Sequence, residues 1–370
     1  MMPLRLYQLL VLLLIVCQCQ AQPSANSTAR RPLAVLAYYS GDATEIDAYN
    51  VQQLTHIIYS FCHLDGNELL VGKGESIIRK LVSLKQKNPS LKILLSLGGW
   101  GGCKTCSDVF ATAAGRDAFS RSVKAWTDKL GTDGIDLDWE YPAIEGHPGH
   151  PYKVEDRANF TELVISLRKA LGKKQEISFA AGGFTKFLEE SIEWKKVMAV
   201  VDRVNIMSYD LINGYSTVTG HHPGLYSTAV QKESADNAVH YLLALGIPAN
   251  KLVIGAAFYA RVFEGVDSVG HGLNRPGKFK SFIPYKHFST SITPELGYTF
   301  YWDDVAKAPY AYNADKKLFA TFDDSLSLDL KTRYALDKGL NGIMFWELTL
   351  DKPEQGLLQA IDIARQRKRK

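Results

Sequence analysis

The sequence predicts an α/β protein in which eight parallel strands, alternating with helices, close into a (β/α)8 TIM barrel. Three observations lead to this fold class. Eight short apolar runs rich in β-branched residues alternate with longer amphipathic stretches. Most of these runs are apolar on both faces, as buried parallel strands are. The chain of 370 residues also exceeds the roughly 250 residues of such a barrel by enough for one insertion.

The expected strands are the short apolar runs, and the expected helices are the amphipathic stretches between them. A doubly wound open sheet is the alternative, but it would need a Gly-rich phosphate loop after the first strand, and residues 37–42 (AYYSGD) are not one. The predicted strands are 33–39, 55–61, 91–97, 134–140, 176–181, 203–209, 252–258 and 342–347. The predicted helices include 75–87, 116–129, 155–171, 229–245 and 326–338.

One connection between strands is out of proportion. About 80 residues separate the seventh and eighth strands, whereas the median connection in compact domains is roughly 4–6 residues. Residues 262–322 within it are rich in Gly, Pro, Tyr and Phe, which predicts a small α+β insertion between strands 7 and 8. The barrel domain is expected to span residues 30–365, with this lobe inside it and a basic tail at 366–370.

Residues 1–21 have the layout of a signal peptide. Arg5 precedes an apolar run, residues 9–16, which is shorter than the roughly 20 residues that cross a bilayer, and a cleavage site is expected near Ala21. Cys17 or Cys19 could instead carry a lipid. We therefore expect a secreted protein with no integral membrane segment after signal removal, and a periplasmic or lipid-anchored form stays open.

The composition is that of an ordinary globular protein, with 46% hydrophobic and 22% charged residues and a formal net charge of +4. Much of the positive charge lies in the tail, which has no interleaved aromatic residues and so does not predict a nucleic-acid partner. Nothing in the sequence demands more than a monomer.

The cysteines and histidines beyond the leader predict neither a metal site nor a cofactor. Cys103 and Cys106 could close a local disulfide, with free thiols and metal or redox chemistry as the alternatives, and Cys62 stands alone. Two histidine pairs, in residues 146–151 and 221–222, have no acidic partners at metal-ligand spacing and are interpreted as loop structure.

The fourth predicted strand carries a run of acids. Because strand side chains alternate between faces, Asp136, Asp138 and Glu140 share the face that lines the barrel interior, and Leu137 and Trp139 share the other. Like charges so close together raise one another's pKa, and burial adds to the rise. The alternative interpretation is that these acids pair with buried Arg or Lys, or bind a metal ion.

Glu140 stands at the carboxyl edge of this strand, where barrel enzymes place their chemistry. A carboxyl among other acids stays protonated near neutral pH, as a general acid that protonates a glycosidic oxygen must. The usual glycosidase adds a second carboxylate as nucleophile or base. This strand offers none that could reach across a sugar ring from Glu140.

Residues 133–140 (DGIDLDWE) resemble the signature of family 18 glycoside hydrolases, the chitinase family, and the resemblance extends over roughly residues 33–351. It implies that Asp136, Asp138 and Glu140 are catalytic and that the nucleophile is the substrate's own N-acetyl carbonyl, with retention of configuration. The implied substrates are chitin and chitooligosaccharides, cleaved at β-1,4 bonds between N-acetylglucosamine units, with endo action expected. The insertion lobe matches the family's insertion domain, which raises one wall of the cleft.

The resemblance also assigns roles at the ends of other strands. Residues 96–99 (SLGG) are similar to a second family signature, and Ser96 is expected to hydrogen-bond near Asp136. Tyr209 and Asp210 are implied to hold the N-acetyl group, with Asp210 accepting its N–H and Tyr209 donating to its carbonyl. A core tyrosine and a helix N-cap aspartate are the structural alternative.

Aromatic residues complete the expected cleft. Trp346, at the end of the eighth strand, is similar to the tryptophan that floors the subsite of the distorted sugar, and Trp100 resembles a platform on the leaving-group side. A core tryptophan and an ordinary exposed aromatic are the respective alternatives. The other substrate-binding candidates are Tyr38, Phe61, Met207, Tyr259 and Arg261.

Two other functions are carried forward. A related endo-β-N-acetylglucosaminidase, which cuts inside the chitobiose core of N-glycans, has a similar catalytic strand. A chitin-binding lectin on the same fold typically lacks the catalytic glutamate, whereas Glu140 is present here. Trp100 and the insertion lobe favour a linear polymer in a lined groove.

Overall fold

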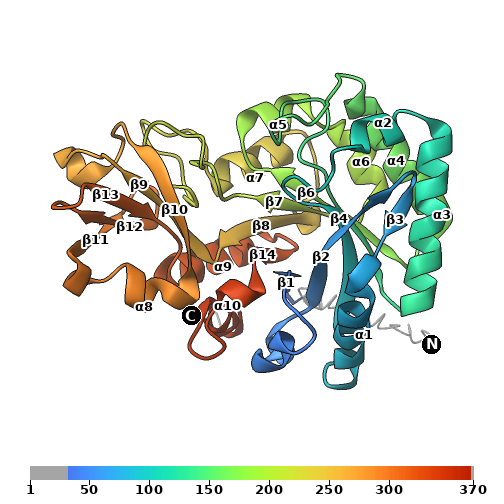
Figure 1. The fold of residues 1–370 in the computed structure, drawn as a ribbon, viewed down its shortest axis with the longest axis horizontal. Coiled ribbons are helices and arrows are strands. Elements are labelled where there is room, and N and C mark those ends of the chain that lie inside the picture. Colours follow the sequence, from blue (N-terminus) through green and yellow to red (C-terminus); the bar gives the residue numbers. More distant parts are fainter. Residues whose placement is uncertain (1–31, 368–370) are drawn as a thin grey trace, which may run out of the picture. The chain divides into compact units, whose positions relative to one another are not determined.

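The computed structural model describes residues 32–367. The predicted signal peptide and residues 368–370 of the predicted basic tail lie outside the described residues. Eight parallel strands run around a barrel in the order β1-β14-β8-β7-β6-β5-β4-β2, and β1 pairs with β2 to close it (Figure 1), which confirms the predicted barrel. The barrel strands are β1 (Ala34–Tyr39), β2 (His56–Asp65), β4 (Lys92–Gly98), β5 (Gly134–Asp138), β6 (Glu176–Gly182), β7 (Arg203–Met207), β8 (Leu252–Ala257) and β14 (Gly342–Trp346).

Helices cover the outside of the barrel and bury their apolar faces against it. The longest helix, α3, shows how local chemistry sets its ends. Thr112 caps its first turn by accepting the Gly115 N–H at 3.0 Å, and Gly131 ends it in the left-handed conformation. The helices are α1 (Glu75–Ser83), α2 (Cys106–Phe110), α3 (Ala113–Leu130), α4 (Asp156–Leu171), α5 (Thr185–Glu190), α6 (Trp194–Val200), α7 (Ala235–Ala244), α8 (Phe288–Ser291), α9 (Ser325–Lys338) and α10 (Leu357–Gln366).

Side chains fill the barrel interior, and alternation along the strands decides which ones. A large apolar cluster lies between the strands and the helices, and a smaller one lies within the barrel. Polar and acidic side chains of β5 take the interior positions that aliphatic residues take elsewhere. The buried members of the interior cluster are Leu36, Tyr38, Ile58, Leu94, Tyr209, Val253, Ala257, Tyr259 and Met344.

Two strands end two residues earlier than predicted. β5 ends at Asp138 rather than at Glu140, because the Asp138 carbonyl accepts its last ladder bond from Gly99 N–H at 2.9 Å. β7 ends at Met207 rather than at residue 209. There the Ser208 hydroxyl donates to the Gly255 carbonyl at 2.9 Å in place of a backbone ladder. Glu140 therefore lies on the first turn of a loop at the barrel mouth.

Helix α7 starts at Ala235, six residues later than the predicted 229. The Thr228 hydroxyl accepts the Gln231 N–H at 3.0 Å, which makes a local turn, and Ser234 then caps the helix by accepting the Asn237 N–H at 3.0 Å. Side chains that hydrogen-bond their own backbone compete with helix in this way.

The segment that connects β8 to β14 in the sequence forms a second sheet. Its five strands are antiparallel in the order β10-β9-β13-β12-β11, and Figure 1 shows them together at one side of the barrel. β9, the first of these strands in the sequence, begins at Tyr259 directly after β8, so the sheet begins earlier than the expected residue 262. Its strands are β9 (Tyr259–Glu264), β10 (Lys278–Pro284), β11 (Tyr298–Asp303), β12 (Ala308–Asn313) and β13 (Leu318–Thr321).

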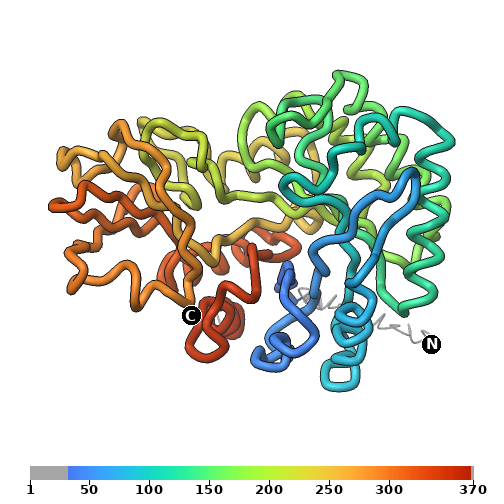
Figure 2. The backbone as a smooth tube through the Cα atoms, in the orientation of Figure 1, coloured from blue at the N-terminus to red at the C-terminus, as the bar shows by residue number. Residues whose placement is uncertain are grey.

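The connection from β7 to α7, which contains no helix or strand, lies against this lobe (Figure 2). Thr219 N–H donates to the Arg275 carbonyl at 2.8 Å, Gly277 N–H donates to the Thr217 carbonyl at 3.0 Å, and Val218 forms an isolated bridge with Pro276. The connection that follows the carboxyl end of β7 is therefore held by the inserted lobe as well as by the barrel.

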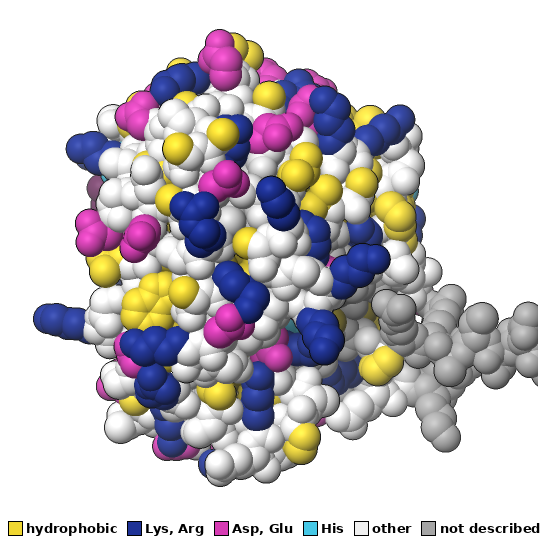
Figure 3. Space-filling model, turned by 90° about the vertical axis from the view of Figure 1, so that its right-hand side faces the viewer, with side chains coloured by type: hydrophobic (Ala, Val, Ile, Leu, Met, Phe, Trp, Pro, Cys, Tyr) yellow, Lys and Arg dark blue, Asp and Glu magenta, His cyan; other side chains and the backbone are white. Residues whose placement is uncertain are grey.

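The surface carries charges of both signs. On the face that bears α1 and α3, basic and acidic side chains are interspersed (Figure 3), and several form pairs, such as Lys129 with Glu75 at 2.8 Å. Cys103 and Cys106 form a disulfide, and Cys62 is buried as a free thiol. Within residues 32–367, no helix combines the length and the apolar character needed to cross a membrane.

Candidate active site

Asp136 lies at the centre of a buried hydrogen-bond network inside the barrel. Its Oδ2 accepts from the Tyr38 hydroxyl at 3.1 Å and the Ser96 hydroxyl at 2.9 Å. Its Oδ1 accepts from the Ser178 hydroxyl at 2.6 Å and the Asn205 amide at 3.0 Å. Burial raises the pKa of Asp136, and these four hydrogen bonds oppose the rise.

Asp138, two residues further along β5, has a different environment. Its Oδ1 is buried and has no hydrogen-bond partner among the described residues. Burial first, and then the charges of Glu140 and Asp136, raise the pKa of Asp138 well above its usual value. Asp138 therefore holds its proton more tightly than an ordinary aspartate does.

Glu140 follows β5 and remains partly open to solvent. Burial raises its pKa to about 7, a hydrogen bond with the Tyr141 side chain opposes the rise, and the charge of Asp210 adds to it. A carboxyl with a pKa near 7 can both give and take a proton under physiological conditions. In residues 32–367 none of these three acids pairs with an Arg or Lys, and no group of metal-ligating side chains forms.

Two glycines let the strand ends approach the acids closely. Gly98 has φ +115°, and a Cβ there would lie 2.1 Å from the Asp138 carbonyl oxygen. Gly99 has φ +78°, and a Cβ there would lie 2.3 Å from the Phe61 ring. A side chain at either position would push β2 or β5 out of place.

Asp210 is an anion held by cations and polar groups. Arg261 Nε donates to Oδ1 at 2.8 Å, and Nη2 donates to Oδ2 at 2.5 Å. Burial would raise the pKa of Asp210, but its contacts with His222 and Arg261 outweigh burial and lower the pKa below the usual range. Asp210 has φ +55°, a left-handed conformation that aspartate adopts more readily than most residues.

Tyr209 faces the barrel interior and keeps its proton. Burial first, then the neighbouring carboxylates, raise the pKa of its hydroxyl well above the usual value. The hydroxyl lies 3.8 Å from the Met344 sulfur, a weak acceptor. Tyr209 is therefore a hydrogen-bond donor without a strong partner, directly beside the acids. Met207 and Tyr259 line the same interior wall.

Trp346 ends β14 beside the acids. Its ring stacks on Phe61 with centroids 5.5 Å apart and planes 14° apart, and it tilts against Tyr38 at 5.8 Å. This packing fixes the indole as a flat apolar surface. Sugar rings present apolar C–H faces that pack on such surfaces.

A second aromatic group lies at the rim. Trp100 is 48% exposed and lies 6.2 Å from Tyr215, which is 66% exposed, and 5.4 Å from His147. Tyr215 is a residue that we did not predict from the sequence. An aromatic side chain in a Gly- and Ser-containing loop is the only local signal for it, and that signal is common.

The histidines interpreted as loop structure have different surroundings. His221 and His222 are buried, and His221 pairs with Asp303 of β11 at 2.9 Å. His222 contacts Asp210, which is one of the predicted site residues. The contact joins segments that are 12 residues apart, and no sequence spacing predicts it.

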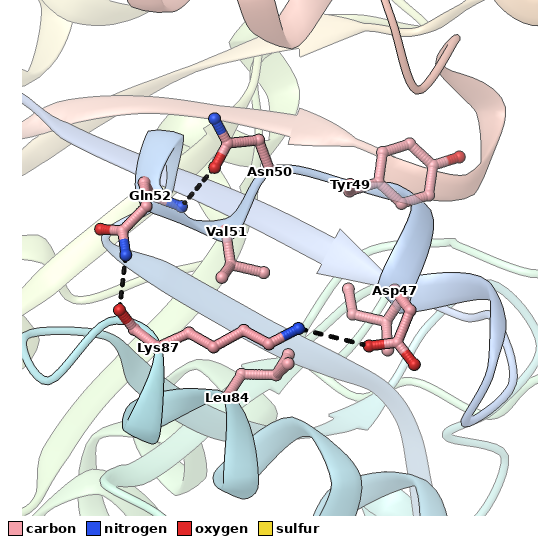
Figure 4. Close-up of a pocket in the computed structure, with 8 residues that line it drawn as sticks. Asp47, Tyr49, Asn50, Val51, Gln52, Leu84 and Lys87 are labelled. Carbon is pink, nitrogen blue, oxygen red and sulfur yellow. Dashed lines mark hydrogen bonds and ion pairs between the residues drawn. The ribbon is translucent and has the colours of Figure 1, made fainter.

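A separate cavity lies away from the acids. It has a volume of about 200 Å³ and lies between the β1–β2 connection and the end of α1, and Figure 4 shows the residues that line it. Its walls include Asp47, Tyr49, Asn50 and Lys87, and its polar groups already bond to one another, as Gln52 Nε2 does with the Lys87 carbonyl at 2.5 Å. None of the predicted site residues lines it.

Comparison with known proteins places this geometry in a family. The family model for glycosyl hydrolases family 18 matches residues 34–351. Chitinase A1 of Niallia circulans is 36% identical over 74% of this chain and 43% of its own length, so the chain spans less than half of that relative. Chitotriosidase-1 of Mus musculus is 33% identical over 80% of this chain and 67% of its own length.

Solved structures agree. A family 18 N-acetylglucosaminidase from Paenibacillus barengoltzii is 32% identical, with a TM-score of 0.83 over 90% of this chain and 99% of that one. A group IV chitinase of Ostrinia furnacalis, solved in complex with allosamidin, is 27% identical, with a TM-score of 0.81 over 90% of this chain and 98% of that one. Together with the barrel and its acids, these matches show that the chain belongs to glycosyl hydrolases family 18.

Proposed function

We propose that this protein is a chitinase, which hydrolyses β-1,4 bonds between N-acetylglucosamine units of chitin and chitooligosaccharides by substrate-assisted, retaining catalysis. One observation carries the proposal. Glu140 has a pKa near 7, whereas both oxygens of Asp210 are occupied by Arg261. Asp136 and Asp138 are buried on the same strand that leads to Glu140, and Asp210 is bound by Arg261. Among residues 32–367, no carboxylate therefore stands across a sugar ring from Glu140, and the nucleophile comes from the substrate.

The first step transfers the Glu140 proton to the glycosidic oxygen as the bond to the anomeric carbon breaks. The carbonyl oxygen of the 2-acetamido group attacks that carbon and closes an oxazolinium ring. The Tyr209 hydroxyl, which has only a weak partner in the protein, donates to this carbonyl oxygen and orients it. Water then opens the ring with Glu140 as base, and the configuration is retained.

Asp138 takes a role that the sequence assigned to Asp210. Its buried Oδ1 has no partner among the described residues, whereas both Asp210 oxygens bind Arg261. A protonated carboxyl keeps one oxygen as acceptor and uses its O–H as donor. Asp138 Oδ1 therefore accepts the acetamido N–H, while its proton can pass toward Glu140 once that residue has become an anion.

The aromatic groups divide the cleft. Trp346 packs against the sugar that is distorted during reaction, and Trp100 with Tyr215 offers an exposed surface on the leaving-group side. Aromatic surfaces on both sides of the cleaved bond favour internal cleavage of a polymer. An exposed rim also supports chitin or its oligosaccharides as partners. Secretion by the predicted leader and a monomeric state belong to the same proposal.

Product analysis on chitin oligomers of five and six residues tests the proposal. We expect cleavage at internal bonds, with the new reducing end first appearing as the β-anomer by NMR, and competitive inhibition by a thiazoline analogue of the intermediate. A first product in the α-form would exclude retention. Cleavage of chitobiose-core N-glycans without cleavage of chitin oligomers would favour the endo-β-N-acetylglucosaminidase, and binding without any cleavage would favour the lectin.

A further inference from the structure

His222 lies where three segments meet, and its ring is fully buried. Its Nδ1 accepts the backbone N–H of Asp210 at 3.3 Å. Its Nε2 lies 3.2 Å from the carbonyl oxygen of Tyr259, the first residue of β9. Its backbone N–H donates to the Thr321 hydroxyl at 3.0 Å, at the end of β13. The residue thus joins the end of β7 to both ends of the inserted lobe.

The hydrogen bonds select one form of the ring. Nδ1 lies 3.3 Å from the Asp210 backbone nitrogen, whose N–H points at it, and 3.5 Å from Asp210 Oδ1, which is the longer contact. This arrangement assigns the ring proton to Nε2, which donates it to the Tyr259 carbonyl. Burial lowers the pKa of His222, with the charge of Asp210 and that of Asp323 opposing the change and that of Arg261 supporting it. The ring therefore stays neutral, and its two nitrogens have two different tasks.

Asp210 needs such support. Its φ of +55° lies in the left-handed region, which is strained for a residue with a side chain. Conformations of this kind persist when their surroundings hold them from several sides. Arg261 holds the carboxylate of Asp210, and His222 holds its backbone N–H. The turn also sets the direction of Tyr209, the preceding residue.

We propose that His222 is a positioning residue, which fixes the left-handed turn at Asp210 through Nδ1 and so presents the hydroxyl of Tyr209 to the substrate. The inference rests on the proposed hydrolysis, in which Tyr209 orients the acetamido group. His222 itself does not meet the substrate, because it is fully buried behind Asp210.

Two substitutions distinguish the hydrogen bond of Nδ1 from that of Nε2. The side-chain oxygen of Asn overlies Nδ1, so His222→Asn keeps the acceptor for Asp210 and loses the donor to Tyr259. The side-chain amide of Gln overlies Nε2, so His222→Gln keeps the donor and loses the acceptor. We expect His222→Asn to retain kcat within a few-fold. We expect His222→Gln to lower kcat about 100-fold with little change in KM, because a misplaced orienting group costs that much.

His221→Gln is the matched control, because His221 is also buried in this connection but pairs with Asp303 and not with Asp210. This variant should lower the unfolding temperature without lowering kcat. Wild-type kcat in His222→Gln, or equal losses of kcat in His222→Asn and His222→Gln, would overturn the proposal.

Amide exchange makes the test independent of the reaction. If the wild-type protein cleaves no chitin oligomer, the proposed function fails, but the exchange rate of the Asp210 amide still reports on its hydrogen bond. Faster exchange in His222→Gln than in His222→Asn, by about tenfold or more, supports the positioning role. Equal exchange in the two variants overturns it.

Discussion

Arg261 binds both carboxylate oxygens of Asp210, although the two residues come from different sheets. Arg261 lies on β9 of the lobe, and Asp210 follows β7 of the barrel. We expect Arg261→Ala to remove most activity and to cost about 1–3 kcal/mol of stability, since the anion it leaves is only partly exposed. Arg261→Lys should retain part of both. Arg275→Ala, at an exposed pair with Asp267, should leave kcat unchanged in the same assays.

Replacing Glu140 by Gln removes the acid without changing the shape of the site. Hydrolysis of chitin oligomers should fall about 100-fold to 10,000-fold, while affinity for allosamidin by calorimetry should stay within a few-fold. Glu145→Gln is the control, since Glu145 is exposed on the same loop. Normal turnover by Glu140→Gln would show that Glu140 is not the general acid.

The pKa of Glu140, about 7, sets the alkaline limit of the reaction. The proton is present below pH 7 and lost above it, so kcat/KM should fall about tenfold per pH unit at higher pH.

Asp138→Asn removes the carboxyl whose pKa the charge of Glu140 raises. The alkaline limit of the reaction should therefore shift, and turnover should fall. A pH profile that matches the wild type would remove Asp138 from the mechanism.

Replacing Trp346 and replacing Trp100 should have effects that depend differently on the length of the substrate. Trp346→Ala removes the surface beside the acids and should lower kcat/KM for every oligomer. Trp100→Ala should raise KM mainly for substrates that extend over the rim, because its ring lies 6.2 Å from Tyr215 there. Kinetics on oligomers of two to six sugars would show this, and equal effects of both changes at all lengths would contradict it.

Lys331 and Asp323 form an ion pair at 2.6 Å with both side chains fully buried. Lys331→Met leaves the carboxylate without its cation and should cost about 3–5 kcal/mol in urea unfolding. Lys124→Met, which breaks an exposed pair with Asp128, should cost less than about 1 kcal/mol. Similar losses in the two variants would show that the buried pair contributes nothing special.

Much of the barrel could be predicted because its signals are local. Apolar runs with the right length and flanks indicated all eight barrel strands, and the alternation along β5 put Asp136 and Asp138 on the interior face. The strand ends were less predictable. Whether the chain continues in the sheet after Asp138 depends on which neighbour supplies the next hydrogen bond, and here Gly99 supplies the last one.

The contacts that order the site are nonlocal, and sequence patterns do not encode them. Asp210 and Arg261 are 51 residues apart, and His222 and Thr321 are 99 residues apart. A single sequence shows that Asp210 follows a strand, but it does not show that a guanidinium will occupy both of its oxygens. For this reason the acceptor for the acetamido N–H was expected at Asp210, whereas we propose Asp138.

The inserted lobe is an integral part of the catalytic domain, because residues of the lobe support the site. Arg261 stands on its first strand, Thr321 ends its last one, and the connection after β7 lies along it. A shortened barrel that joined residues 258 and 322 directly would keep every acid of β5 but lose the support of Asp210. If the lobe is exchanged for that of a relative, in evolution or by engineering, we therefore expect activity to be kept only when the β7–α7 connection is exchanged together with it.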